Sequence, residues 1–177
     1  MGDDEVTLRP VREEDLDLLQ RFDTDPSALG EFEWFGFTDA NVRRRRWEQD
    51  GLLGADSSLL GVALPDGTFA GIVTWRAVSG AGTPDGSCVE IGIALFPEYR
   101  GSGRGTVAQR QLLGYLFEHT PVHRIQATTE VDNSAERHAL EHVGFRREGV
   151  MRGAVFRRRV WRDLVIYSCL REDSLDH

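Results

Sequence analysis

The sequence predicts a mixed α/β fold in one domain, and three observations predict it. Apolar positions alternate between strand spacing and helix spacing in the order strand, helix, strand, helix, and the chain closes with two strands. The 177 residues suit one domain, and 40% hydrophobic residues are enough for a buried core. Neither an internal repeat nor an interdomain linker is visible, so we expect residues 1–177 to form a single domain.

The first half of the chain is expected to hold a strand, two helices and a hairpin. Acidic residues in the first turn, followed by Leu16 and Leu19 at helical spacing, predict the first helix. Thr38 or Asp39 is expected to cap the second helix. A Pro-Asp-Gly-Thr turn joins the hairpin strands, because proline presets φ and glycine accepts a positive φ. The expected strands are 6–11, 58–64 and 69–78, and the expected helices are 12–22 and 38–50.

The second half is built around a strand that is apolar on both faces, residues 88–96, as a central strand would be. An amphipathic helix follows from Arg104 to His119, with its apolar positions at helical spacing. Those positions are Ala108, Leu112, Tyr115 and Leu116. The other expected elements are a loop at 79–87, a strand at 124–131, a helix at 133–143 stopped by Gly144, and antiparallel strands at 145–158 and 162–170.

Composition excludes several classes of chemistry. All 21 basic residues are arginine, and the missing lysine excludes Walker-A phosphate binding, Schiff-base chemistry and pyridoxal phosphate attachment. The net charge of −8 disfavours general nucleic-acid binding. No long apolar run and no signal peptide are present, so we expect a cytoplasmic protein with no membrane or nucleic-acid partner. Cys88 and Cys169 lie in apolar stretches, where reduced, buried thiols are expected.

The stretch PEYRGSGRGT, residues 97–106, contains three glycines and joins the central strand to the amphipathic helix. Unpaired amides and the positive end of the helix dipole converge at such a junction, which predicts an anion site. Two nucleotide templates do not match. The dinucleotide fingerprint needs its third glycine where Thr106 stands, and the P-loop needs a lysine. A phosphate-bearing ligand of another kind is therefore expected.

The motif R-x-x-G-x-G, from Arg100 through Gly103 to Gly105, resembles the hallmark of the GNAT superfamily of N-acetyltransferases. The stretch LRPVREEDLDLL resembles the family's opening, and NSAERHALEHVGF resembles its fourth helix. GFRREGVMR and WRDLVIYSCL resemble the closing strands of the Rim-type subgroup, which includes enzymes acting on ribosomal-protein N-termini. The resemblance implies the GNAT fold, a mixed, mostly antiparallel twisted sheet of about seven strands with about four helices.

The resemblance also implies acetyl-CoA as the donor, with its pyrophosphate on the loop amides and its pantetheine arm beside the preceding strand. The implied cofactor-binding residues are Ile93, Leu95, Arg100, Gly101, Ser102, Gly103, Arg104, Gly105, Thr106 and Asn133. Asn133 is also expected to cap its helix. The implied reaction is direct acetyl transfer, in a ternary complex, to a primary amine of a small molecule or a peptide N-terminus. A homodimer and a larger acyl group both stay open.

Glu90 is the first candidate for the general base, because it is an acid on an otherwise apolar strand close to where some family members place a glutamate base. A glutamate paired with an arginine explains it equally well. Glu130, Glu31 and Glu33 are the reserves. Leu140 and Glu136 stand where many relatives have a tyrosine or a serine near the sulfur, so water is expected to protonate the thiolate.

Glu31, Trp34, Phe35 and Trp75 are the expected acceptor-binding residues, because the loop between the first two helices borders that site in this family. The aromatic residues fit a core position equally well. Two other functions compete. The stretch HALEH at 138–142 matches the H-x-x-E-H signature of a zinc peptidase. The stretch FRRRVWR at 156–162 mixes arginine with aromatics as nucleic-acid binders do, although a hairpin loop with solvated arginines also explains it.

Overall fold

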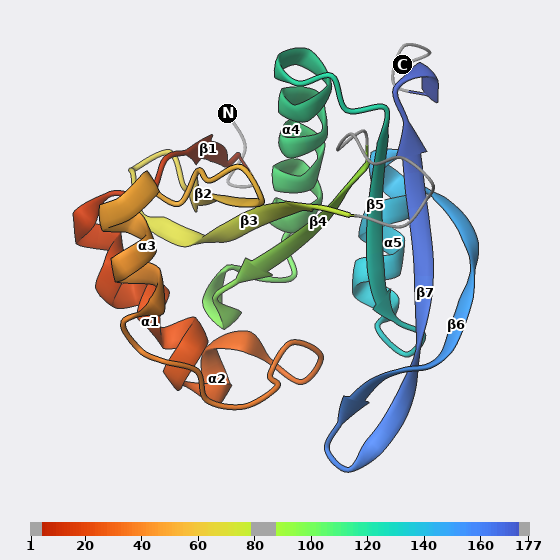
Figure 1. The fold of residues 1–177 in the computed structure, drawn as a ribbon, viewed down its shortest axis with the longest axis horizontal. Helices are drawn as coiled ribbons and strands as arrows, with labels where there is room; N and C mark the ends of the chain where they lie inside the picture. Colours follow the sequence, from red (N-terminus) through yellow and green to blue (C-terminus); the bar gives the residue numbers. More distant parts are fainter. Residues whose placement is uncertain (1–4, 79–87, 174–177) are drawn as a thin grey trace. The chain divides into compact units, whose positions relative to one another are not determined.

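The computed structural model describes residues 5–78 and 88–173, so the loop expected at 79–87 lies outside the described residues. The elements are β1 Thr7–Arg9, η1 Glu13–Asp15, α1 Leu16–Thr24, α2 Pro26–Leu29, α3 Val42–Asp50, β2 Ser57–Ala63, β3 Phe69–Ala77, β4 Cys88–Leu95, η2 Pro97–Tyr99, α4 Arg104–His119, β5 Arg124–Glu130, α5 Ser134–Val143, β6 Arg146–Arg157 and β7 Val160–Leu170. Figure 1 shows their course along the chain.

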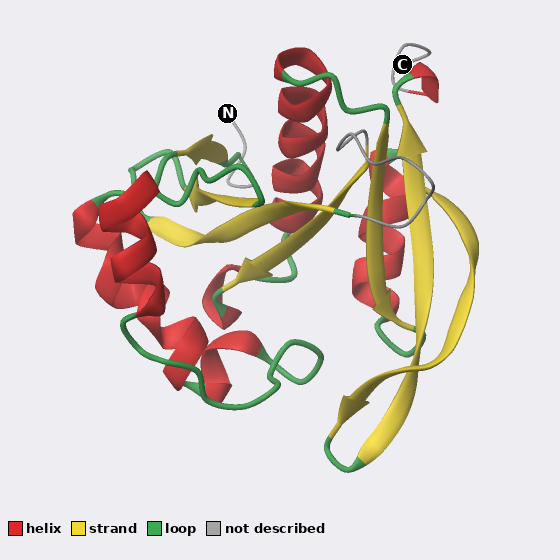
Figure 2. Ribbon diagram, viewed as in Figure 1, coloured by secondary structure: helices red, strands yellow, loops and turns green. Residues whose placement is uncertain are grey.

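The strands are hydrogen-bonded in the order β1-β2-β3-β4-β5-β7-β6. β4 and β5 run parallel, whereas β1 with β2, β5 with β7, and β6 with β7 are antiparallel. Figure 2 shows these strands in yellow and the helices in red. The predicted mixed, mostly antiparallel sheet of seven strands with four longer helices is confirmed, and α2 is an additional short helix.

The strands are divided between two compact units. The first holds the chain up to residue 75 together with residues 92–112, and the second holds residues 76–91 and the chain from residue 113 onward. The boundary passes through both β4 and α4, so each unit contains one part of that strand and one part of that helix.

The first unit is organised around the apolar face of α1. Leu16 and Leu19 are buried, as the helical spacing predicted. Phe22 is buried as well, and its ring stacks on Phe96 with centroids 4.5 Å apart. The one-turn η1 precedes α1 because the Asp15 carboxylate accepts a hydrogen bond from the Arg12 amide and pairs with Arg9. The first helix is therefore confirmed, with its acidic first turn in 3-10 geometry.

The second helix begins later than predicted. α3 starts at Val42 and its N-cap is Asn41, whose side chain makes no capping bond. The expected cap at Thr38 or Asp39 is wrong, because the Asp39 carboxylate instead accepts from the Asn41 amide and closes a turn ahead of the helix. α3 buries no residue completely and is held by Trp47, whose ring nitrogen donates to the Val11 carbonyl at 2.9 Å.

The predicted turn between β2 and β3 has the expected chemistry. The Asp66 carboxylate accepts from the Thr68 amide at 2.9 Å, and Gly67 has a φ of 89°. The amide of Leu64 donates to the Thr68 carbonyl at 2.9 Å, which closes the hairpin. The predicted hairpin is confirmed.

The second unit is a parallel pair extended by an antiparallel one. Cys88–Glu90 of β4 align with Arg124–Gln126 of β5, and β5 pairs along its length with β7. Asn133 caps α5 by accepting from the Glu136 amide at 3.2 Å, and Gly144 ends the helix with a φ of 107°. Both helix boundaries are therefore confirmed.

Most of the predicted apolar face of α4 is buried. Ala108, Leu112 and Leu116 are completely inaccessible to solvent, whereas Tyr115 is exposed and its ring packs at 5.1 Å from the ring of His119. The assignment of Tyr115 to the apolar face is thus wrong: a residue three positions after Leu112 lies at the margin of the helix face, where the phenol can remain in water. Cys88 and Cys169 are free, buried thiols, as expected.

Candidate functional site

The glycine loop, residues 101–103, lies between η2 and the start of α4. Gly101 and Gly103 both have a φ of 81°, a left-handed conformation that is strained for residues with a side chain. An ideal Cβ atom on either glycine would meet no heavy atom within 4 Å. The glycines are therefore required by the backbone conformation, and the space beside them is open to a ligand.

The chemistry of this loop fits a phosphate. The first amides of α4 have no acceptor within the helix and lie at the positive end of its dipole. The Ser102 hydroxyl oxygen is buried and makes no hydrogen bond within the described part of the chain. A bound anion would accept from this hydroxyl as well as from the amides. Ser102 and the two left-handed glycines are thus the residues that would hold a pyrophosphate.

Gly105 has a different role from the two loop glycines. A Cβ atom at this position would lie 3.6 Å from Ile93 Cδ1 and 3.8 Å from Leu95 Cδ1. The first turn of α4 therefore approaches the end of β4 closely, and a larger side chain would occupy that space. This packing places the residues of β4 that the resemblance assigns to the pantetheine arm directly beside the loop.

The Arg100 side chain is bound to backbone carbonyls. Its Nε donates to the Leu95 oxygen at 2.8 Å, and its Nη2 donates to the Ala28 oxygen at 2.7 Å. Gly30 packs on the same guanidinium, because a Cβ atom there would lie 2.6 Å from Nη1. Arg100 therefore ties the end of α2 to the end of β4. Direct contact of Arg100 with a cofactor phosphate stays a prediction.

Glu33 is one of the reserve candidates for the general base. It lies half-buried in the segment after α2, and burial raises its pKa to about 7, while the charge of Arg100 acts in the opposite direction. No local sequence pattern distinguishes it from Glu31, which is exposed. The only available signal was an acid between aromatic residues, in the stretch EFEWF.

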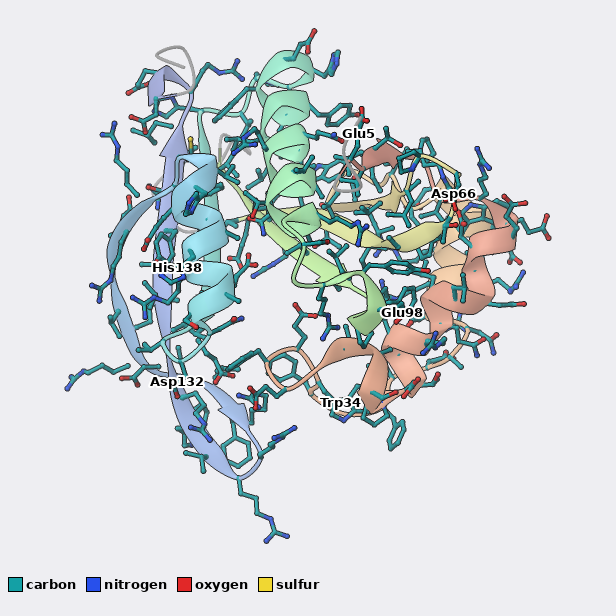
Figure 3. All side chains as sticks on the ribbon, turned by 180° about the vertical axis from the view of Figure 1, so that it is seen from behind. Glu5, Trp34, Asp66, Glu98, Asp132 and His138 are labelled. Carbon is teal, nitrogen blue, oxygen red and sulfur yellow. The ribbon has the colours of Figure 1, made fainter. Side chains whose placement is uncertain are left out.

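The aromatic residues expected at the acceptor site are not core residues. Phe35 and Phe37 are exposed, and Trp34 and Trp75 are half-buried. Trp34 packs edge-on against Phe37 with ring centroids 5.2 Å apart, and Figure 3 labels it on the segment that follows α2. Accessible aromatic side chains of this kind are typical of a binding surface rather than a core.

Glu90, the first candidate for the base, belongs to the second unit, as does Asn133. Its carboxylate accepts from Gln126 Nε2 at 3.1 Å and from Thr128 Oγ1 at 3.3 Å, and it pairs with Arg76 at 3.2 Å. This is the arginine-paired arrangement that the sequence left open. Three donors occupy the oxygens that would receive a proton from an amine, so the role of Glu90 as the base stays a prediction.

Another reserve acid, Glu130, is held in a buried ion pair. Both of its oxygens accept from Arg157, at 2.6 and 2.7 Å, and the two side chains are 4% and 5% exposed. Both carboxylate oxygens are thus engaged by the guanidinium of Arg157, so the role of Glu130 as a base stays a prediction.

The histidines of the H-x-x-E-H stretch are placed along α5. His142 Nδ1 lies 2.8 Å from the His138 carbonyl, and Glu141 accepts from the Tyr167 hydroxyl at 2.9 Å. Over residues 5–78 and 88–173, no three His, Cys, Asp or Glu side chains gather as metal ligands. In the same part of the chain, no helix has the length and apolar character needed to cross a bilayer.

Comparison with known proteins identifies the family. Residues 5–146 match the family described as acetyltransferase (GNAT) domain. The chain belongs to the GNAT acetyltransferase family. A GNAT relative from Bacillus subtilis (strain 168), "Putative ribosomal N-acetyltransferase YdaF", is 30% identical over 110 residues, which cover 62% of this chain and 58% of YdaF. Another from the same organism, "Uncharacterized N-acetyltransferase YnaD", is 31% identical over 48% of this chain and 49% of its own. The chain thus spans about half the length of these relatives.

Solved GNAT structures agree over nearly the full chain. RimJ of Mycobacterium smegmatis, in complex with CoA-disulfide, superposes with a TM-score of 0.75 at 28% identity, covering 95% of this chain and 83% of RimJ. The spermidine N-acetyltransferase of Vibrio cholerae, in complex with CoA and spermine, has a TM-score of 0.80 at 19% identity and covers 96% of this chain and 98% of its own. At that identity the second likeness concerns the fold alone. The Rim-type GNAT resemblance is confirmed.

Proposed function

We propose that this GNAT protein transfers an acetyl group from acetyl-CoA to a primary amine, as a single catalytic domain. The observation that carries the proposal is the glycine loop, where two left-handed glycines, the buried Ser102 hydroxyl and the start of α4 form an open anion site. The complex of RimJ with CoA-disulfide supports coenzyme A as its ligand. The zinc peptidase alternative has no support from the comparisons.

The reaction assigns distinct tasks to the chain. Acetyl-CoA supplies the thioester. The amine nitrogen of the acceptor bonds to the carbonyl carbon, the carbon–sulfur bond breaks, the amine loses a proton to a base, and the thiolate takes a proton from water. The loop amides and Ser102 hold the pyrophosphate, and the backbone of β4 beside Ile93 and Leu95 guides the pantetheine arm. The carbonyl oxygen is expected to accept from a backbone amide of β4 near Ile93.

Glu33 is the stronger of the two base candidates. A base must be unprotonated before reaction and hold a proton afterwards, and this is best met by a pKa near the working pH. Burial raises the pKa of Glu33 to about 7, and its carboxylate lies within the unit that holds the glycine loop. Glu90 is instead held by three donors in the other unit.

A Glu33→Gln substitution tests this assignment through pH dependence. In the wild type, kcat/KM should rise with pH through about 7 as Glu33 loses its proton, and the substitution should remove that limb and lower the plateau by about 100-fold. Glu90→Gln is the matched comparison and should keep the limb. A retained limb in Glu33→Gln, with loss of the limb in Glu90→Gln, would return the base role to Glu90.

Glu33→Gln should also change how the melting temperature depends on pH. The pKa of Glu33 in the folded protein, about 7, lies above its ordinary value near 4.5, so the folded state holds this proton more tightly than the unfolded state. The contribution of this proton to the stability of the folded state is complete below the ordinary pKa, near 4.5, and is lost as the pH rises through about 7. Glu33→Gln should therefore flatten the fall in melting temperature between these pH values.

The acceptor is proposed from the segment after α2. Trp34, Phe35 and Glu31, with Trp75 of β3, offer aromatic faces and a carboxylate, which together suit a cationic amine. The description of YdaF as a putative ribosomal N-acetyltransferase supports a protein amine, such as a peptide N-terminus, as the acceptor. A small polyamine is the second acceptor class to test, because a spermidine N-acetyltransferase shares the fold. We place the enzyme in the cytoplasm, with no role for a membrane.

The deciding experiment combines binding with turnover. Coenzyme A should raise the melting temperature, because it binds the native state. An acetyl-CoA screen over peptides with free N-termini and over polyamines, read as thiol release, should then identify the acceptor. Absence of a thermal shift at millimolar coenzyme A would refute the donor, whereas a shift with no turnover would refute only the acceptor classes.

A further inference from the structure

The acceptor segment, residues 30–38, follows α2 and begins against the Arg100 side chain. Arg100 Nη2 donates to the carbonyl of Ala28, near the end of α2, at 2.7 Å. Gly30 has a φ of 78°, and a Cβ atom there would lie 2.6 Å from Arg100 Nη1. The guanidinium therefore occupies the space that a side chain at residue 30 would need, and it fixes the point at which the chain leaves the helix.

The end of the acceptor segment is held by the buried Asp23 carboxylate of α1. This carboxylate accepts from Thr38 Oγ1 at 3.0 Å and from Arg43 Nε at 2.6 Å. The Thr38 amide donates in turn to the Asp23 carbonyl at 3.1 Å. Hydrogen bonds to a charged, buried group are among the stronger ones in a protein. The segment is therefore held at both ends, while Phe35 and Phe37 between them are exposed.

The same guanidinium is bonded to the strand that leads toward the glycine loop. Arg100 Nε donates to the carbonyl of Leu95, the last residue of β4, at 2.8 Å. A guanidinium can bridge two carbonyls in this way because its N–H groups form a rigid, planar fork. η2 and α2 are neighbours in the first unit, where Figure 3 labels Glu98 of η2 and Trp34 of the acceptor segment. Arg100 therefore joins the start of the acceptor segment to the end of β4 that the pantetheine arm is proposed to follow.

The proposed base belongs to the segment that Arg100 holds. Glu33 is half-buried within residues 30–38, and the charge of Arg100 acts against the rise that burial gives to the Glu33 pKa. Such an effect requires the guanidinium to lie near the carboxylate. Displacing a reacting group by about 1 Å can cost about 100-fold in rate. A side chain that fixes this segment therefore controls the place of the base as well as that of the aromatic residues.

We propose that Arg100 is a positioning residue for the acceptor, whose guanidinium fixes the acceptor segment on the end of β4, a role that rests on the proposed function of that segment. The motif R-x-x-G-x-G alone would assign this side chain to a cofactor phosphate. Two of its N–H groups are instead bonded to carbonyls of the chain. Removal of the guanidinium should therefore weaken the acceptor side of the reaction far more than the binding of coenzyme A.

Limited digestion with chymotrypsin tests this fastening without an acceptor, because the protease cleaves after aromatic residues and needs the segment to open locally. Arg100→Met removes the donors and keeps a long, apolar side chain. Cleavage within residues 34–37, identified by mass spectrometry, should become about 30-fold faster, as expected for the loss of two hydrogen bonds of ordinary net strength. Calorimetry should show an affinity for coenzyme A within about threefold of that of the wild type.

Arg171→Met is the matched control, in the second unit. Arg171 Nε donates to the Val122 carbonyl at 2.9 Å, and its Nη1 donates to the Phe117 carbonyl at 2.6 Å, so this variant loses bonds of the same kind. It should lower the melting temperature, because those carbonyls lose their donors. The rate of cleavage within residues 34–37 and the KM for the acceptor should stay unchanged.

Gly30→Ala examines the same contact with the arginine still in place. The added methyl group would displace the guanidinium, so cleavage of the acceptor segment should again become faster. Gly51→Ala is its control, because Gly51 also has a positive φ, 66°, and its Cβ atom would meet nothing within 4 Å. Both variants carry the backbone strain of a left-handed alanine, and only Gly30→Ala should open the segment.

Turnover distinguishes positioning from a purely structural role. With the peptide or polyamine that gives thiol release, Arg100→Met should raise the KM for that amine at least about tenfold and change the KM for acetyl-CoA less than about threefold. Arg100→Lys keeps the charge but lacks the planar fork, so it should behave like Arg100→Met.

Unchanged cleavage in both Arg100→Met and Gly30→Ala would overturn the proposal. So would a wild-type KM in Arg100→Lys, which would assign the effect to charge alone. A fall of more than about tenfold in coenzyme A affinity, with unchanged cleavage, would make Arg100 a cofactor ligand instead. A wild type that does not bind coenzyme A would refute the proposed function, whereas the cleavage rates would still show whether Arg100 holds the segment.

Discussion

Gly71→Ala is expected to destabilise the protein by at least about 3 kcal/mol, because the added methyl group meets the backbone of the neighbouring strand. A Cβ atom at Gly71 of β3 would lie 2.2 Å from the Ala94 carbonyl oxygen and 2.7 Å from the Leu95 Cα. No rotation of a side chain relieves a backbone contact. β3 and β4 would have to separate at the point where the Phe96 amide donates to the Ala70 carbonyl.

Urea denaturation measures this loss as a lower midpoint at an unchanged slope. Gly114→Ala is the matched control, because Gly114 lies inside α4 and its Cβ atom would meet nothing within 4 Å. That substitution should leave stability unchanged or raise it by up to about 1 kcal/mol, since alanine is the better helix former. If Gly71→Ala unfolds at the wild-type midpoint, the close approach of the two strands is incorrect.

Gly103→Asp is expected to abolish the stabilisation of the protein by coenzyme A. The new carboxylate would project into the open space beside the loop, where the phosphate is proposed to bind, and like charges repel. The wild type should gain about 2.7 kcal/mol at a coenzyme A concentration 100 times its Kd, which a thermal melt detects as a shift of several degrees. The variant should show no shift.

The control for this experiment is Gly67→Asp. Gly67 also has a positive φ, 89°, and open space around its Cβ position, but it lies in the turn between β2 and β3. Both substitutions carry the same backbone strain, about 1 kcal/mol, and the same added charge. Gly67→Asp should keep the coenzyme A shift. Equal shifts in the two variants would show that the loop at Gly103 does not hold the cofactor.

Local patterns were sufficient for most of the fold. The helical spacing of Ala108, Leu112 and Leu116 and the turn chemistry around Gly67 depend on residues a few positions apart, and these elements were predicted correctly. The predictions that were wrong concern residues at the edges of the sequence patterns. The N-cap of α3 is Asn41, and the Tyr115 side chain is exposed. Local packing decides which residue at the edge of a pattern caps a helix or is buried.

The sequence by itself determined the strand, the glycine loop and the helix at which we propose that an anion binds, because the conformations of Gly101 and Gly103 and the dipole of α4 are local properties. Only the tertiary structure decided the surroundings of the candidate carboxylates. Glu90 is held by Gln126 and Thr128, 36 and 38 residues away, and burial in the folded chain raises the pKa of Glu33. Burial and hydrogen bonding at these acids depend on residues distant in the chain, which no short stretch of sequence contains.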